Sequence, residues 1–167
     1  MKRLLILTLL IVALLAAPTS AVTMNFMDIQ VEETGDAMVT IDYTLTFFEK
    51  IPVMLNMANP SEEIRKAIDE NDPNNRVDLL SADWESVVLQ VTNYAKTYEG
   101  QVPGTITQMT PMTDFSKAED TLNSYWFAPL IDIDLSPALT KIMFADGYSE
   151  QFDNQLIIPS VTHTFSP

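Results

Sequence analysis

The sequence predicts an α+β fold, in which a mainly antiparallel β-sheet and two short helices form a single domain after an N-terminal signal peptide. Three observations predict this fold: segments in which apolar and polar residues alternate, patterns that start helices, and turn residues between these segments. The clearest alternation is in residues 37–49, where Val39, Ile41 and Tyr43 fall on one side of the chain. A period of two with β-branched and aromatic residues is typical of a strand in a half-buried sheet.

Residues 1–21 have the pattern of a secretory signal peptide. Lys2 and Arg3 give a positive start, an apolar run follows over residues 4–17, and small residues lead to Ala21. The apolar run is shorter than the roughly 20 residues that a membrane-spanning helix needs. We expect cleavage after Ala21, so that residues 22–167 form one domain that is extracellular, periplasmic or held at the cell surface.

The composition limits the classes of partner. The chain has no cysteine, and without Lys2 and Arg3 it keeps seven basic residues against 23 acidic ones, a net charge of −16. The lack of cysteine excludes disulfides and, with no Asn-x-Ser/Thr site, favours a prokaryotic source. Because so acidic a surface repels nucleic acid and anionic lipid, we expect neither as a partner. No later apolar run is long enough for a membrane helix, so we expect no membrane insertion after cleavage.

The N-terminal part of the domain is predicted to form a β-hairpin. Residues 23–33 and 37–49 are its strands, and Gly35 lies in the turn, where glycine accepts a positive φ. Strict alternation places Met24 and Met27 on opposite faces of the first strand. Residues 77–95 also alternate, but their phase changes near residues 83–86. A bulge or a tight bend is therefore expected there.

Two helices are predicted from their first residues. The first begins at Asn59, an N-cap residue that Pro60 follows at the first helical position, and it ends near Glu70. The second begins at Asp114 or at Ser116. Its buried side is expected to consist of Phe115, Ala118, Leu122 and Trp126.

The C-terminal third is predicted to be all β. Strands are expected over residues 127–135, 139–145, 148–152 and 155–165, with a hairpin turn at Asp146-Gly147. Pro159 favours an edge or an irregular position, because proline lacks the amide hydrogen that a ladder needs. His163, the sole histidine, shares the more apolar side of the last strand with Ile157, Val161 and Phe165. We interpret it as a packed histidine with a structural hydrogen bond.

The sequence contains no catalytic motif. Cysteine-based catalysis and zinc sites of several His or Cys ligands lack the necessary residues. Calcium suits the acidic composition better, because it takes hard oxygen ligands. One calcium candidate is the loop after the first helix, and the other is a pair of aspartates on one side of a strand. The candidate ligands are Asp69, Asp72 and Asn74 in the loop, and Asp132 and Asp134 on the strand.

These observations favour an exported protein of the cell envelope that acts by structural assembly or protein interaction, with calcium as a possible bridge, rather than an enzyme. The first and last strands are expected at sheet edges, where unpaired backbone groups allow self-association or pairing with another envelope component. One alternative is a monomeric extracellular ligand-binding module, with Tyr125 and Trp126 beside the loop of residues 99–113 as its recognition surface. The other is a small hydrolase that uses two carboxylates.

Overall fold

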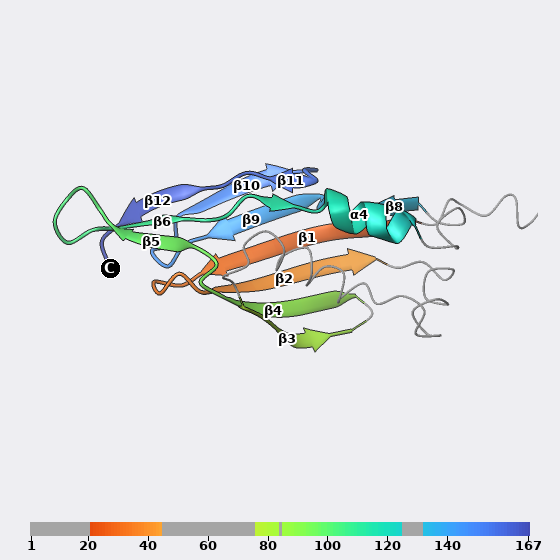
Figure 1. The fold of residues 1–167 in the computed structure, drawn as a ribbon, viewed down its shortest axis with the longest axis horizontal. Coiled ribbons are helices and arrows are strands. Elements are labelled where there is room, and N and C mark those ends of the chain that lie inside the picture. Colours follow the sequence, from red (N-terminus) through yellow and green to blue (C-terminus); the bar gives the residue numbers. More distant parts are fainter. Residues whose placement is uncertain (1–20, 45–75, 84, 125–131) are drawn as a thin grey trace, which may run out of the picture.

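The computed structural model describes residues 21–44, 76–83, 85–124 and 132–167. Within these residues the protein is mostly β, with one helix, and its sheets are mixed but rich in antiparallel pairs. Figure 1 shows the strands running along the length of the molecule, with the helix α4 near one end. The helix predicted over residues 59–70 lies outside the described residues. No helix among the described residues is long and apolar enough to cross a bilayer.

The larger layer is one sheet of seven strands. Their order is β10-β9-β1-β2-β4-β3, and β8 also pairs with β1. The bounds are β1 (Ala21–Val31), β2 (Ala37–Thr44), β3 (Arg76–Ala82), β4 (Ser86–Thr92), β8 (Asp132–Asp134), β9 (Leu139–Met143) and β10 (Ser149–Asp153).

β1 lies inside this sheet, so the prediction that the first strand forms an edge is wrong. It pairs antiparallel with β2 on one side, and parallel with β8 and β9 on the other. After β4 the chain enters the second layer. It then returns to the large sheet as β8 and β9, which lie on the other side of β1 from β2 and run in the same direction as β1. This return gives the sheet its parallel pairs, whereas its other pairs are antiparallel.

A bulge in β1 changes which side chains face the core. The pairing with β2 shifts between Met24 and Phe26, which places the extra residue at Asn25. Met24 and Met27 are therefore both buried, although strict alternation predicts opposite faces for them. In β2 the prediction is confirmed, because every second residue from Ala37 to Tyr43 is buried.

The second layer consists of two small sheets and the helix. The three-stranded sheet has the order β12-β6-β5, so the last strand lies at an edge, as predicted. The two-stranded sheet pairs β11 with β7. The bounds are β5 (Lys96–Glu99), β6 (Ile106–Met109), β7 (Thr113–Asp114), α4 (Ser116–Asn123), β11 (Ile157–Ile158) and β12 (Thr162–Phe165).

One hydrophobic core joins the two layers. Buried side chains of the large sheet, such as Ile29 and Leu89, belong to the same cluster as Phe115 and Leu122 of the helix region and Val161. Phe115 at the start of the helix and Ala118 and Leu122 within it are buried, as predicted, whereas Trp126 of the same prediction lies outside the described residues. Its start is held by the Asp114 side chain, because Oδ1 accepts a 2.9 Å hydrogen bond from the Ser116 amide.

The predicted last strand is two short strands, β11 and β12, separated at Pro159. Ile157 is exposed and Ile158 is buried, so the expectation that Ile157 shares the inner side with Val161 is wrong. Val161 and Phe165 are buried, as expected. The interruption is bridged by Thr110, whose Oγ1 accepts a hydrogen bond from the Val161 amide at 2.9 Å. Proline cannot donate to the ladder, which explains the break at this place.

Candidate functional site

The strand β3 forms a free edge of the large sheet. Among the described residues it pairs with β4 alone, and most of its length is exposed. Val77 faces the core, but Leu79 and Leu80 expose 46% and 55% of their surface. The pairing shifts between Leu79 and Ser81, so Leu80 is the bulged residue. Two large apolar side chains thus lie beside backbone groups that face away from β4.

The other sheet edges are different in character. β10 is the opposite edge of the large sheet and carries Glu150 and Asp153, and β5 is a fully exposed edge of four residues. Charged side chains and short strands protect edges against pairing with another chain. On β3 the only charged side chains are Arg76 and Asp78, which pair with each other at 3.0 Å near its start. The second half of β3 therefore has exposed Leu79 and Leu80 and no charged side chain.

A hollow of about 450 Å³ lies where β3 turns into β4. Asp83 and Glu85 come from this turn, and Asp42 comes from the end of β2. None of the described residues that line it is basic, and these residues present carboxylates and neutral polar groups. Its lining consists of Asn25, Asp42, Tyr43, Thr44, Asp83, Glu85 and Ser86.

Asp83 organises the turn beside this hollow. Its Oδ1 accepts hydrogen bonds from the amides of Glu85 at 2.8 Å and Ser86 at 2.7 Å. These bonds favour the charged form, so they lower the pKa of the Asp83 carboxyl. The backbone is fixed from the other side by Tyr43, whose hydroxyl donates to the Asp83 carbonyl at 2.5 Å. The bend predicted near residues 83–86 is therefore confirmed. Because its pKa is lowered, the Asp83 carboxyl stays ionised and is a poor general acid.

The residues predicted as calcium ligands are only partly described. Asp132 and Asp134 lie on β8, and Asp134 Oδ1 accepts a 2.8 Å hydrogen bond from the Ser136 amide, which closes a local turn. In the described parts of the chain, no three His, Cys, Asp or Glu side chains are grouped so that they could hold a metal ion. Asp69, Asp72 and Asn74 lie outside these parts, so the loop site stays a prediction.

The predicted recognition surface is also incomplete. Tyr125 and Trp126 lie outside the described residues, and their role stays a prediction. The loop of residues 99–113, predicted to lie beside them, contains β6, in which Gln108 is completely buried. Thr110 and Thr113 are buried as well. These three residues of the loop are therefore part of the core, whereas Met112 is 53% exposed.

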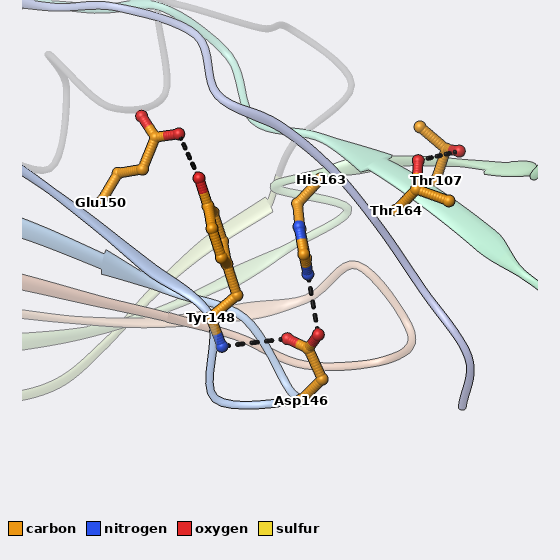
Figure 2. A network of polar contacts seen from close by, with 6 residues as sticks. All are labelled: Thr107, Asp146, Tyr148, Glu150, His163 and Thr164. Atoms are coloured by element: carbon orange, nitrogen blue, oxygen red, sulfur yellow. Dashed lines mark hydrogen bonds and ion pairs between the residues drawn. The ribbon is translucent and has the colours of Figure 1, made fainter.

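His163 lies in a separate polar and aromatic cluster, drawn in Figure 2. Its Nε2 is 2.8 Å from Asp146 Oδ2, and its ring stacks on that of Tyr148 with centroids 4.1 Å apart. The Tyr148 hydroxyl donates to Glu150 Oε1 at 2.7 Å. This geometry agrees with the interpretation of His163 as a packed histidine with a hydrogen bond.

Comparisons with protein-family models, curated proteins and solved structures found no match to this chain. The candidate site at β3 and the hollow therefore depends on its own geometry. The sequence did not predict the hollow, because Asn25, Asp42 and Asp83 come from three separate segments. The one signal in the sequence was the phase change at Asp83, which marks the turn but not its neighbours.

Proposed function

We propose that the protein is an exported component of the cell envelope that acts by protein interaction, and that it binds an extended segment of a partner along the free edge of β3. The exposed Leu79 and Leu80 on this edge are the observation that carries the proposal. An added strand gains affinity from main-chain hydrogen bonds, and alternate side chains provide specificity. Burying these two leucines under a partner also removes apolar surface from water.

The acidic hollow supports a partner segment with a basic residue. Asp83 and Glu85 lie in the turn that follows β3, and Asp42 lies beyond them on β2, so a bound segment that continues past Ala82 brings its side chains near this turn. A lysine or arginine there is attracted by the carboxylates, and the large negative charge of the chain steers basic partners toward it. The proposed ligand is therefore an extended peptide with alternating apolar and basic residues.

Binding to synthetic peptides tests this proposal. The protein is expressed with its own N-terminus in a bacterial host, and the exported product is titrated with a labelled peptide of alternating valine and arginine. Fluorescence anisotropy is expected to show binding that Leu80→Lys weakens by about tenfold, because a charge on the edge opposes strand addition. The matched control is Gln151→Lys on the exposed edge strand β10, which is expected to leave binding unchanged.

The hollow is tested with a second peptide, in which glutamate replaces arginine. We expect this peptide to bind at least about tenfold more weakly, because it meets like charges at the hollow. Asp42→Asn and Glu85→Gln are expected to reduce that difference. Equal binding of the two peptides, or an unchanged affinity in Leu80→Lys, contradicts the proposal.

Assembly of identical copies is the second candidate function. β3 and β10 are the two free ends of the large sheet among the described strands, so copies joined edge to edge form an open row. The acidic surface opposes such contacts unless a cation screens it. Sedimentation velocity at several protein concentrations, with and without millimolar calcium, separates the candidates. Growth into large species that calcium strengthens supports assembly, whereas a single monomer species contradicts it.

A further inference from the structure

The two layers are connected at β12 by a contact that the proposed interaction does not use. His163 belongs to β12 in the three-stranded sheet, and Asp146 belongs to the turn between β9 and β10 of the large sheet. Their side chains meet at 2.8 Å and are 16% and 31% exposed. Figure 2 shows the His163 ring and the Asp146 carboxylate pointing at each other across the gap between these segments.

Aromatic rings hold the imidazole in this position. The Tyr148 ring is nearly parallel to it, with an interplanar angle of 8° and a centroid distance of 4.1 Å. The rings of Phe165 and Phe144 lie 5.6 Å and 5.1 Å away. Contacts of this kind favour one orientation of the ring. The imidazole is therefore aimed at Asp146 by packing as well as by the hydrogen bond.

We propose that His163 and Asp146 form a pH-dependent latch, which fastens β12 to the turn between β9 and β10 more tightly when His163 is protonated. Histidine is the side chain that changes charge near neutral pH. Protonation turns a hydrogen bond between a neutral ring and a carboxylate into a charge-assisted pair, which is stronger. The contact is therefore expected to be stronger in mildly acidic than in mildly basic solution.

The other groups described around His163 are expected to keep the same charge over this pH range. The turn contributes Asp146 and Tyr148, and β10 contributes Glu150 through its bond with the Tyr148 hydroxyl. On β6, the residue opposite His163 is the uncharged Gln108. The hydrogen bond from His163 lowers the pKa of Asp146, so this carboxylate stays ionised while a histidine titrates. The bond to Glu150 raises the pKa of Tyr148, which keeps the phenol neutral.

A double-mutant cycle tests the latch. The exported protein and its Asp146→Asn, His163→Gln and combined variants are unfolded with urea at pH 5.5 and at pH 8.0. We expect the coupling between the two sites to change the unfolding equilibrium constant by about fivefold more at pH 5.5 than at pH 8.0. The matched control is the cycle of Thr107→Ala and Thr164→Ala, whose hydroxyls form an uncharged 2.8 Å contact between β6 and β12.

The control coupling is expected to be the same at both pH values. A His163–Asp146 coupling that is absent, or equal at both pH values, overturns the proposal.

If a variant does not fold, the unmodified protein still provides the test. Its β12 amides, observed by NMR, are expected to become more open to hydrogen exchange as the His163 ring signal titrates, after correction for the intrinsic pH dependence of exchange. Opening that does not follow the His163 titration overturns the latch. The test measures stability and exchange, so its outcome is independent of peptide binding at β3.

Discussion

Gly35 shows how one residue connects the two layers. It lies in the turn between β1 and β2 with a φ of +91°, and its carbonyl accepts a 2.8 Å hydrogen bond from the Ala95 amide. Gln108 reaches the same turn, because its Nε2 donates to the carbonyls of Glu32 at 2.8 Å and Glu33 at 3.1 Å. The turn is thus a contact between the layers as well as a hairpin connection.

Replacing Gly35 by alanine is expected to destabilise the protein strongly. A Cβ at this position lies 2.4 Å from the Ala95 carbonyl oxygen and 2.9 Å from Thr97 Oγ1, so backbone must move. Because this steric clash adds to the strain of a positive φ, we expect Gly35→Ala to lower the free energy of unfolding by at least about 3 kcal/mol. Urea denaturation measures this loss.

The control for Gly35 is Gly104→Ala. Gly104 has a φ of +83°, but an added Cβ has no neighbour within 4 Å. Its substitution therefore costs only the backbone strain, about 1 kcal/mol. Equal losses for the two variants contradict the close approach of Gly35 to Ala95.

Gln108 could not be predicted as a core residue from the sequence. It lies in a stretch rich in Gly, Pro, Thr and Gln, which is typical of an exposed loop. It is buried because the carbonyls of Glu32 and Glu33, which lie far away in the sequence, are brought to its amide group. A buried polar side chain is stable only with such partners, and the partners are a result of the fold.

At the scale of elements, the hairpin of β3 and β4 depends on a carboxylate. Asp83 accepts the amide hydrogens of Glu85 and Ser86, which lowers its pKa. A carboxyl whose pKa is lower in the folded state stabilises the fold above its unfolded pKa and loses this effect as the pH falls through the folded value. The turn is therefore expected to weaken in acid.

This pH dependence is measured with Asp83→Ala. We expect the variant to be less stable than the unmodified protein at pH 6, and the difference to shrink as the pH falls below about 4, the usual range of an aspartate pKa. Urea denaturation across this range gives the difference. Asp83→Asn keeps an oxygen acceptor without the charge, so its stability is expected to show less pH dependence. A difference between Asp83→Ala and the unmodified protein that stays constant down to pH 2.5 contradicts this account.

The elements that were predicted well depend on neighbours in the sequence. The turn at Asp146-Gly147 is confirmed by the hydrogen bond from the Gly147 amide to the Phe144 carbonyl at 2.9 Å. The second helix was predicted to begin at Asp114 or at Ser116, and α4 spans Ser116–Asn123. Pro159 indicated an irregular position in the last strand. The exposure of Ile157, however, depends on how the chain runs between β11 and β12.

At the scale of the whole molecule, export remains a prediction that processing can test. β1 begins at Ala21, so cleavage after Ala21 removes only its first paired residue and leaves Val22 opposite Ile133. N-terminal sequencing of the exported product is expected to begin at Val22. Ala21→Phe is expected to block cleavage, because signal peptidases need a small residue there. A product that keeps Lys2 and Arg3 contradicts the predicted signal peptide.

The sequence by itself determined the local features: the alternation of β2 and β4, the turns at Gly35 and Asp146, and the start of α4. These depend on side-chain type and on residues a few positions apart. The tertiary structure decided the central place of β1, its parallel neighbours, the acidic hollow and the contact of His163 with Asp146. Each of these brings together segments that are distant in the chain. Local propensity does not specify such pairings, because the free energy that selects them comes from burying one core between two layers.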